Sequence, residues 1–257
     1  MQAMSMTIPV YKQLLTAWCL LSVIIFFLLL KITAPYGRHA RKGWGFSINN
    51  RLGWFLMEIV SPLSFGCFFM QNSEKSSVNW LFFSLWMAHY FNRSIIYPLR
   101  IPDKSKQMPL LISVSAICFN GMNGFLNGYY LGILKPGYEN AWMTDVRFVL
   151  GILLFVSGFI INFSSDNILI HLRKNSAEGE YKIPEGGFFR WISCPNYLGE
   201  IIEWSGWAVA TWSLPGFSFA LWTAANLFPR AIKHHKWYRL KFNHYPSGRK
   251  AIIPGVI

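Results

Sequence analysis

Long apolar blocks, each about as long as a helix that crosses a membrane, constrain the fold of this chain more than any other feature. One of them, LLTAWCLLSVIIFFLLL, begins at Leu14. About 20 apolar residues in helical form cross the hydrocarbon core of a bilayer. No small-residue cleavage site follows the block, so it does not resemble a signal peptide. We therefore expect an all-α integral membrane protein.

The composition supports this expectation. Hydrophobic residues make up 53% of the 257 residues and charged residues only 14%, whereas soluble domains average about 25% charged. We predict about seven transmembrane helices, near 14–32, 52–71, 80–97, 110–131, 148–169, 198–212 and 217–232. The last two are separated only by SLPG, which predicts a tight hairpin broken at Pro215. No repeat or long linker divides the chain, so 1–257 is expected to form a single domain.

The formal charge of +13 is distributed unevenly between the loops. With seven spans, 19 Lys and Arg residues fall on one side, four on the other and Arg93 within a span. Basic loops stay in the cytoplasm, so we expect the N-terminus outside and the C-terminus in the cytoplasm. The basic excess thus indicates topology, with phosphate binding possible on that side, and we expect no nucleic-acid partner.

The cysteines favour neither a disulfide framework nor a metal site. No two of them have C-x-x-C spacing, and they are dispersed over different spans. Adjacent side chains on a helix point apart, so His234 and His235 do not form a metal pair. We expect no bound metal.

Polar residues recur inside or at the ends of the spans, where ionisable groups are costly and mark functional sites. Many are three, four or seven residues apart, so that they share a helix face. The stripes are Trp54 and Glu58; Asn162, Asp166 and Arg173; Asn196, Glu200 and Glu203; and Arg230, His234 and Tyr238. Most lie toward the basic end of their spans. They predict a polar cavity that opens toward the cytoplasm.

Two acidic residues at the start of the sixth span allow more than one interpretation. Glu200 and Glu203 can belong to the site, or lie at the membrane interface as many end-of-helix glutamates do. Taken singly, the Arg and Lys residues at span ends can likewise be interfacial anchors. Glu58 is harder to explain in this way, because it is deepest and has no cation at helical spacing.

The chain has neither the G-x-G-x-x-G dinucleotide fingerprint nor a P-loop. Any nucleotide must therefore be held by side chains of the helices and their loops. The longest loop on the basic side, within 171–197, is rich in Gly, Pro, Lys and Tyr. We expect this segment and the tail 230–257 to form a cytoplasmic cofactor-binding region.

Several stretches together resemble the steroid 5α-reductases (3-oxo-5α-steroid 4-dehydrogenases). They are GWFLMEIVSP, HYFNRSIIYP, GMNGFLNGYY, INFSSDNILIHLRK, YKIPEGGFFRWISCPNYLGEIIEWSG and the tail RAIKHHKWYRLKFNHYPSGRKAIIP. The likeness covers nearly the whole chain from about Arg51 onward. The P-N-Y-x-G-E element alone is less specific, since sterol reductases and isoprenylcysteine methyltransferases have similar ones.

The resemblance implies a seven-helix enzyme that takes NADPH from the cytoplasm and a 3-oxo-Δ4-steroid from the bilayer. It implies that Glu58 and Tyr90 contact the steroid C3 carbonyl. The NADPH contacts that it implies are Trp54, Arg93, Asn162, Asp166, Arg173, Tyr181, Asn196, Glu200, Arg230, His234, Tyr238 and Arg249. Two positions depart from the family pattern: Met57 stands where Gln is frequent, and Ser115 where some relatives have Arg.

These residue types suit hydride transfer to a conjugated enone, which needs donors to the carbonyl oxygen where negative charge develops. Tyr90 and a protonated Glu58 can be these donors. The arginines suit phosphate groups, which a guanidinium binds with two hydrogen bonds. The proton donor to C4 is not assigned.

Three other functions are compatible with parts of the sequence. They are a related reductase of a polyprenol or another lipid enone, a membrane methyltransferase that uses S-adenosylmethionine, and a proton-coupled transporter. We expect membrane lipids and the lipid substrate as partners, with no obligate protein partner. The expected location is the inner membrane of a bacterium or the endoplasmic reticulum of a eukaryote.

Overall fold

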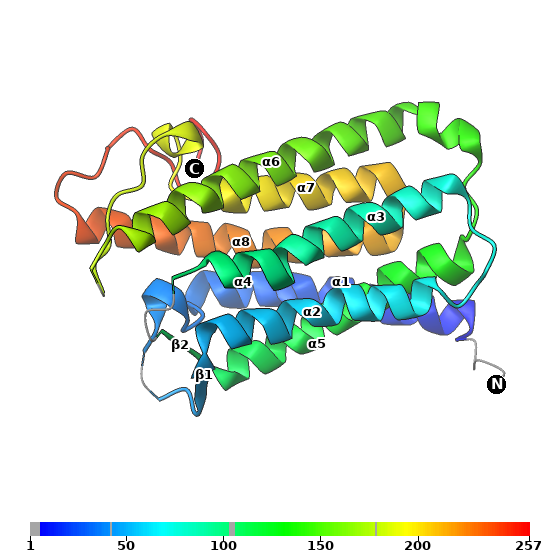
Figure 1. Ribbon diagram of the computed structural model, residues 1–257, viewed down its shortest axis with the longest axis horizontal. Helices are drawn as coiled ribbons and strands as arrows, with labels where there is room; N and C mark the ends of the chain where they lie inside the picture. Colours follow the sequence, from blue (N-terminus) through cyan, green and yellow to red (C-terminus); the bar gives the residue numbers. More distant parts are fainter. Residues whose placement is uncertain (1–5, 42, 103–105, 178) are drawn as a thin grey trace.

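Long helices run side by side along most of the chain (Figure 1), in a computed structural model that describes residues 6–41, 43–102, 106–177 and 179–257. Lys42, Lys104 and residue 178 of the predicted cofactor loop lie outside the described residues. The α-helices are α1 Ile8–Lys31, α2 Asn50–Phe69, α3 Ser77–Phe91, α4 Tyr97–Arg100, α5 Leu110–Tyr129, α6 Val146–Lys174, α7 Pro195–Thr211 and α8 Leu214–Lys241.

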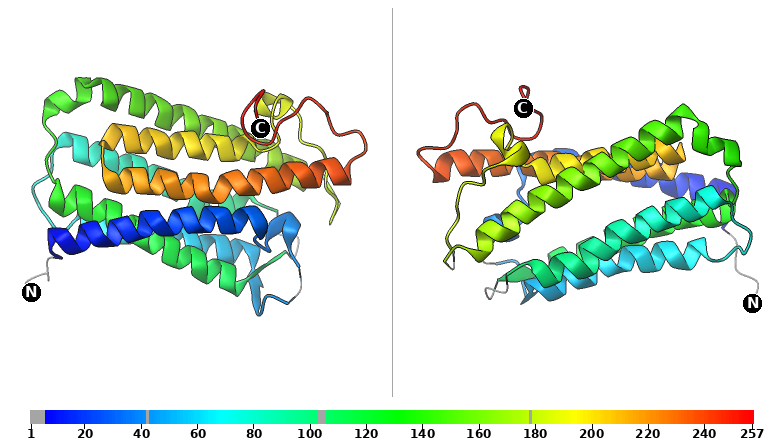
Figure 2. Two further views of the ribbon diagram at one scale, coloured as in Figure 1. Left: turned by 180° about the vertical axis from the view of Figure 1, so that it is seen from behind. Right: turned by 45° about the horizontal axis from the view of Figure 1, so that its top comes forward.

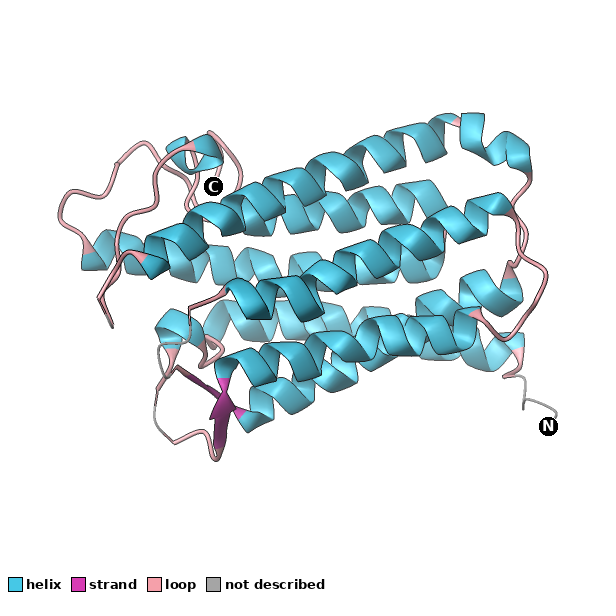
Figure 3. Cartoon of the chain, in the orientation of Figure 1, coloured by secondary structure: helices cyan, strands magenta, loops and turns pink. Residues whose placement is uncertain are grey.

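Two π-helical segments join or extend these helices. The segment η2, Asn92–Ile96, links α3 to α4 into one continuous helix over 77–100, and η3, Tyr130–Leu134, extends α5. The 3-10 helices are η1 Gly37–His39, η4 Asn140–Thr144 and η5 Gly187–Arg190. The expectation of an all-α fold missed one small antiparallel sheet, in which β1 Ser47–Asn49 pairs with β2 Gln107–Pro109 (Figure 3).

Four of the helices are long and apolar enough to cross a membrane: α1, α2, Leu110–Leu134 and α6. Together with the helical fold, they establish an all-α membrane protein. The other long helices, 77–100, α7 and α8, coincide with the remaining three predicted spans. The helix α7 is short, with 17 residues. Many of the polar residues singled out from the sequence lie on these three helices and make them more polar.

The connections alternate between the two ends of the bundle. The loops that follow α1, α4 and α6 lie at the same end as the C-terminus, and the N-terminus lies at the opposite end (Figures 1 and 2). At that far end α7 and α8 form the tight hairpin predicted from SLPG. Pro215 occupies the first turn of α8 and does not break the helix. Backbone N–H groups in the first turn have no partner within the helix, so the missing N–H of proline costs nothing there.

Glycines let the helices approach one another closely in two pairs. On α6 and α7, a Cβ atom at Gly158 would overlap the backbone of Glu203, and one at Gly199 would overlap that of Asn162. On α5, a Cβ at Gly124 would lie 2.6 Å from the Ser61 carbonyl oxygen of α2. Gly124 and Gly128 of α5 are four residues apart, a spacing of small residues that favours close helix packing in membranes.

Large aromatic side chains fill the middle of the bundle. Trp86 of α3 is stacked on Phe65 of α2, with ring centroids 4.6 Å apart. It also lies against Trp204 and Trp207 of α7, both at 5.2 Å. All four side chains are fully buried. The apolar side chains of α1 are instead mostly exposed, as expected of a helix that faces lipid.

Candidate active site

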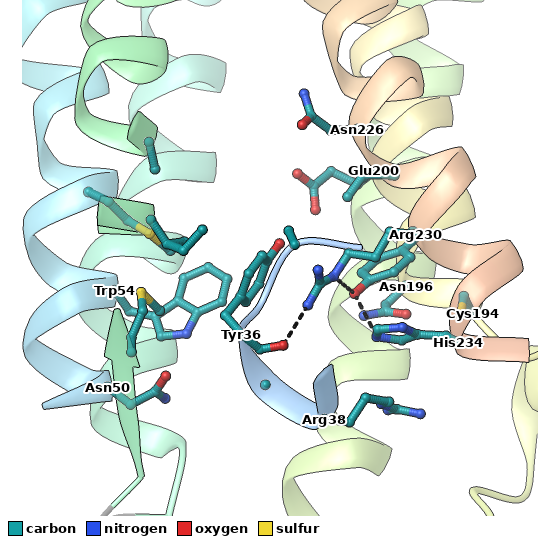
Figure 4. Close-up of a pocket in the computed structure, with 18 of the residues that line it drawn as sticks. Tyr36, Arg38, Asn50, Trp54, Cys194, Asn196, Glu200, Asn226, Arg230 and His234 are labelled. Atoms are coloured by element: carbon teal, nitrogen blue, oxygen red, sulfur yellow. Dashed lines mark hydrogen bonds between the residues drawn. The ribbon is translucent and has the colours of Figure 1, made fainter. Parts of the chain in front are cut away.

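One cavity of about 780 Å³ lies between α2 and α5 on one side and α7 and α8 on the other (Figure 4). The segment from Thr33 to Ala40, which follows α1, contributes to its lining. All the predicted site residues except Arg249 line this cavity. The structure thus brings together polar residues that are up to 184 positions apart, from Trp54 to Tyr238.

Arg93 lies at the junction of three helices. Its guanidinium is 3.7 Å from the Glu58 carboxylate of α2 and 3.3 Å from the Asp166 carboxylate of α6. It also stacks on Trp54, with 4.9 Å to the ring centroid. Arg93 belongs to the π-helical segment η2, and such segments are frequent at functional sites. Glu58 has no cation at helical spacing on α2, but Arg93 of a different helical segment lies beside it.

The two predicted carbonyl-binding residues lie beside Asn120 of α5. The Tyr90 hydroxyl donates to Asn120 Oδ1 at 3.5 Å, and Asn120 Nδ2 donates to the Met57 carbonyl at 2.6 Å. Tyr90 is buried and lines the cavity together with Glu58. Asn120 therefore fixes the phenol and the second helix relative to each other.

A second polar group connects α6 to α7. Asn196 Nδ2 donates to Asp166 at 3.1 Å, and Asn162 Nδ2 donates to the Asn196 carbonyl at 2.9 Å. Glu200, one turn further along α7, is 3.5 Å from the same Asn162 amide. The carboxylate and amide oxygens in this group suit hydroxyl and amide donors of a ligand.

Basic and aromatic residues gather where α8 meets the segment after α1 (Figure 4). Arg230 donates to the Tyr197 hydroxyl at 3.1 Å and to the Tyr36 carbonyl at 3.2 Å. His234 Nε2 is 3.2 Å from the same Tyr197 hydroxyl, and its Nδ1 is 3.0 Å from His39. His234 therefore bonds to residues of this basic and aromatic group.

His39 lies outside the predicted spans, and its charge state depends on its surroundings. Burial and then the nearby Arg230 and Arg38 lower the pKa of His39 to about 4. The imidazole is therefore neutral at pH 7. The charged groups near it among the described residues are all cations: Arg230, Arg38, Arg41 and Lys233.

Arg38 is a cavity residue that the sequence analysis did not identify. Its guanidinium stacks on Tyr238, 4.4 Å from the ring centroid, and on Trp237 at 5.1 Å. Its Nη1 atom is buried and has no hydrogen-bond partner among the described residues. A buried cationic donor without an acceptor is costly. An anionic ligand in the cavity would supply the missing acceptor.

Arg249 is the one predicted site residue that does not line the cavity. Its Nη1 donates to the Pro184 carbonyl at 2.9 Å, in the loop between α6 and α7, and its side chain is buried outside the cavity lining. The tail also pairs with that loop through Ser193 N, which donates to the Lys250 carbonyl at 2.8 Å. Arg249 therefore connects the C-terminal tail to the loop between α6 and α7.

Glu203, for which two interpretations were open, lies outside the cavity lining. Its side chain is fully buried and pairs with His89 Nδ1 at 2.7 Å. The two positions that depart from the family pattern both line the cavity. Met57 is buried there, and Ser115 donates to the Leu111 carbonyl of its own helix at 2.7 Å.

The residues that the sequence analysis missed lie mainly in the connection after α1 and on the apolar part of the cavity. They include Tyr36, Arg38, His89, Asn120, Tyr197, Trp222 and Asn226. Tyr197 and Asn226 could have been found from helical spacing, since Tyr197 lies three positions before Glu200 and Asn226 four before Arg230. Nothing in the sequence of 33–40 showed that this loop folds back into the bundle.

A helical membrane protein whose interior cavity joins an apolar part to a group of carboxylates, amides and arginines is built as an enzyme for a lipid-soluble substrate. Residues 106–257 match the family model of 3-oxo-5-alpha-steroid 4-dehydrogenase. Steroid 5-alpha-reductase DET2 of Gossypium hirsutum is 44% identical over 94% of this chain and 97% of its own length. The 3-oxo-5-alpha-steroid 4-dehydrogenase 1 of Bos taurus is 39% identical over 93% and 94%. The chain belongs to the 3-oxo-5-alpha-steroid 4-dehydrogenase family, whose members are oxidoreductases of steroid metabolism.

Proposed function

We propose that this enzyme uses NADPH to reduce the Δ4 double bond of a 3-oxo-Δ4-steroid, giving the 5α-dihydro product. The observation that carries the proposal is the single cavity in which the Glu58 and Tyr90 side chains lie next to a ring of basic and amide groups. Its two parts match the two reactants. A steroid needs an apolar space with one polar end, and a dinucleotide needs cations and hydroxyl-binding groups.

The residues of the polar part fit a phosphorylated dinucleotide. Arg38, Arg173 and Arg230 would hold its phosphates, since a planar guanidinium binds phosphate through paired hydrogen bonds. The unpartnered Nη1 atom of Arg38 is one such donor. Asn162, Asn196, Asp166 and Glu200 would bind ribose hydroxyls and the carboxamide. Trp54, Tyr181, His234 and Tyr238 complete this lining. Arg249 would act indirectly, by bracing the loop.

NADPH, when bound, supplies the hydride that C5 of the enone accepts. The chain's own residues then stabilise the negative charge that develops on the C3 oxygen. Tyr90 offers a phenol hydroxyl and Glu58, in its protonated form, a carboxyl hydroxyl. Asn120 connects the two helices that carry them, by accepting from the Tyr90 hydroxyl and donating to the carbonyl of Met57, next to Glu58, so that little reorganisation would accompany the reaction.

Arg93 connects the two parts of the site electrostatically. It lies between Glu58 and Asp166, within 4 Å of both carboxylates. A change in the charge of either acid therefore alters the field at the other. This contact couples the carbonyl-binding acid to the residues assigned to the cofactor.

The apolar part of the cavity favours a substrate that enters from the bilayer. Trp18, Ile25 and Leu29 of α1 line it, as do Ile112 and Phe119 of α5. The outward side chains of α1 face lipid. The partners of the enzyme are accordingly a steroid or steroid-like lipid and the membrane lipids themselves.

The proposed membrane arrangement has seven spans, formed by α1, α2, residues 77–100, α5 with η3, α6, α7 and α8. The connections at the C-terminal end carry most of the basic residues. By the positive-inside rule this end is cytoplasmic and the N-terminus is outside. The membrane would be the inner membrane in a bacterium or the endoplasmic reticulum in a eukaryote.

Substrate comparison tests the proposal. Purified protein in detergent is given NADPH with progesterone, testosterone, a polyprenol and a non-steroid lipid enone. We expect cofactor oxidation with the 3-oxo-Δ4-steroids at least ten times faster than with the other lipids. Faster turnover of the non-steroid enone or polyprenol would contradict the steroid assignment. Failure to bind NADPH would contradict the cofactor assignment.

A further inference from the structure

A buried histidine–glutamate pair lies directly behind the carbonyl-binding residues. His89 Nδ1 of α3 is 2.7 Å from Glu203 Oε1 of α7, and the side chains are 3% and 0% exposed. The Trp204 ring packs edge-on against His89, with centroids 4.6 Å apart. Such a pair is expensive to bury, and aliphatic residues of similar volume would join the two helices at lower cost.

The geometry leaves one ring nitrogen of His89 for a ligand. Nδ1 is taken by Glu203, and Nε2 has no hydrogen-bond partner among the described residues. His89 lines the cavity, whereas Glu203 does not. The imidazole therefore has one nitrogen held by a carboxylate and the other on the substrate side, the arrangement by which an acidic partner orients a histidine for proton transfer.

His89 is also adjacent to the reacting end of the proposed substrate. It precedes Tyr90 in the chain, and the two ring centroids are 5.0 Å apart. The charged groups that face His89 come from three elements: Glu58 of α2, Arg93 of η2, and Glu200 and Glu203 of α7. Two of these groups, Glu58 and Glu200, line the cavity together with His89.

We propose that His89 is the proton donor to C4 of the steroid, and that Glu203 is its positioning residue. The inference rests on the proposed function. Hydride addition at C5 leaves an enolate, in which an electron pair is shared between the C3 oxygen and C4. That electron pair forms a new bond from C4 to the Nε2 proton of the His89 imidazolium, which becomes a neutral imidazole. The Nε2–H bond breaks, the C3 carbonyl reforms, and the imidazole recovers a proton from solvent before the next turnover.

Hydrogen exchange on the saturated product tests this step without any hydride transfer. A 5α-dihydro-3-ketosteroid is incubated in D₂O with the protein and the oxidised cofactor, and deuterium at C4 is measured by mass spectrometry and NMR. By microscopic reversibility, the donor of the C4 proton also removes it. We expect the wild-type protein to exchange one of the two C4 hydrogens, with one stereochemistry.

Variants separate a catalytic role from a structural one. His89→Asn should slow the exchange by about 10²-fold or more, the usual contribution of a general acid or base. Glu203→Gln keeps the size and the acceptor and should give a smaller loss. The matched control is Tyr138→Phe, which also removes a buried hydrogen bond to α7, from the Tyr138 hydroxyl to the Thr211 carbonyl, but lies outside the main cavity. It should exchange at the wild-type rate.

Chemical rescue gives a readout that a merely structural role would not produce. Imidazole added to His89→Ala should restore part of the C4 exchange, with loss of stereochemical control. Wild-type exchange in His89→Asn, or no exchange by the wild-type protein, would overturn the assignment of His89. These results leave the proposed function standing if steroid is still reduced. If the wild-type protein did not reduce the steroid at all, that result would instead contradict the proposed function itself.

Discussion

Arg93 illustrates how single residues of this site depend on partners from distant parts of the sequence. Its guanidinium contacts carboxylates on α2 and α6 and stacks on the Trp54 ring. Glu58 by itself is an acid deep in a membrane helix. With Arg93 and the Asn120 amide nearby, it becomes an acid held at a defined position in a cavity.

Removing either proposed carbonyl donor should abolish most steroid reduction. In Glu58→Gln and Tyr90→Phe the shape of the cavity is kept, but one donor to the C3 oxygen is lost or weakened. We expect rates of steroid reduction lower by about 10²- to 10³-fold, while NADPH binding measured by fluorescence stays near the wild-type affinity. Wild-type turnover in both variants would show that neither side chain binds the carbonyl.

Arg173→Ala should weaken NADPH binding more than it alters steroid preference. A charge-assisted hydrogen bond contributes about 1.5–3 kcal/mol, which corresponds to a Kd for NADPH raised roughly 10- to 150-fold. The control is Lys174→Ala, an exposed neighbour that does not line the cavity. If Arg173→Ala changed the order of steroid preference and left the Kd unaltered, the C-terminal end of α6 would not be part of the cofactor site.

His39 should make the free protein less stable in acid. Its pKa is lowered to about 4 in the fold, against about 6.5 in an unfolded chain. The unfolded state therefore binds the proton first, and the free energy of unfolding falls as the pH drops from about 6.5 to 4. In His39→Gln this part of the decline in melting temperature should be absent. An identical pH dependence in both proteins would contradict the assignment.

At the scale of helices, glycines and a π-helical segment determine where the site residues lie. Gly158 and Gly199 bring the α6 and α7 backbones together, which places Asn162 next to Asn196. The segment η2 interrupts the regular α-helical rotation between Tyr90 and Tyr97 and so sets the direction of Arg93. The α6–α7 contact and the π-helical geometry of η2 depend on pairs of helices and on local backbone. They cannot be predicted from the spacing of residues along the sequence.

Gly158→Ala should destabilise the fold, because its methyl group would overlap the Glu203 backbone. Overpacking of this kind costs about 1–3 kcal/mol, which should appear as a lower melting temperature in detergent. Gly121→Ala, on α5, is the control, since its Cβ would lie 3.5 Å from Val60, at ordinary contact distance. Its melting temperature should be unchanged or higher, given the better helix propensity of alanine. Equal melting temperatures for the two variants would contradict the close α6–α7 contact.

At the scale of the whole molecule, the sequence predicts the helices well and their mutual arrangement less well. The seven predicted spans each overlap a helix, because hydropathy depends on local composition. The stripes of polar residues also predicted that Asn162, Glu200 and Arg230 face a common interior, and they line the same cavity. Hydropathy and residue spacing were therefore sufficient to predict the helices and several of the side chains that line the cavity.

What the sequence could not predict requires contacts between segments. The loop from Thr33 to Ala40 folds into the cavity through Tyr36 and Arg38, although nothing in its composition distinguishes it from a solvated loop. The His89–Glu203 pair joins α3 and α7 across 114 positions. The contact of Arg249 with the Pro184 carbonyl likewise joins the C-terminal tail to the loop between α6 and α7.

The most direct test of the account is to follow the transferred hydride into the product. Purified protein is given a 3-oxo-Δ4-steroid and NADPH that carries deuterium at its transferable position, and the product is examined by mass spectrometry and NMR. We predict the 5α-dihydro ketone with one deuterium at C5, and about 10²-fold less of it from Glu58→Gln. Unchanged steroid, deuterium at another carbon, or an equal yield from Glu58→Gln would contradict the proposed reaction and its site.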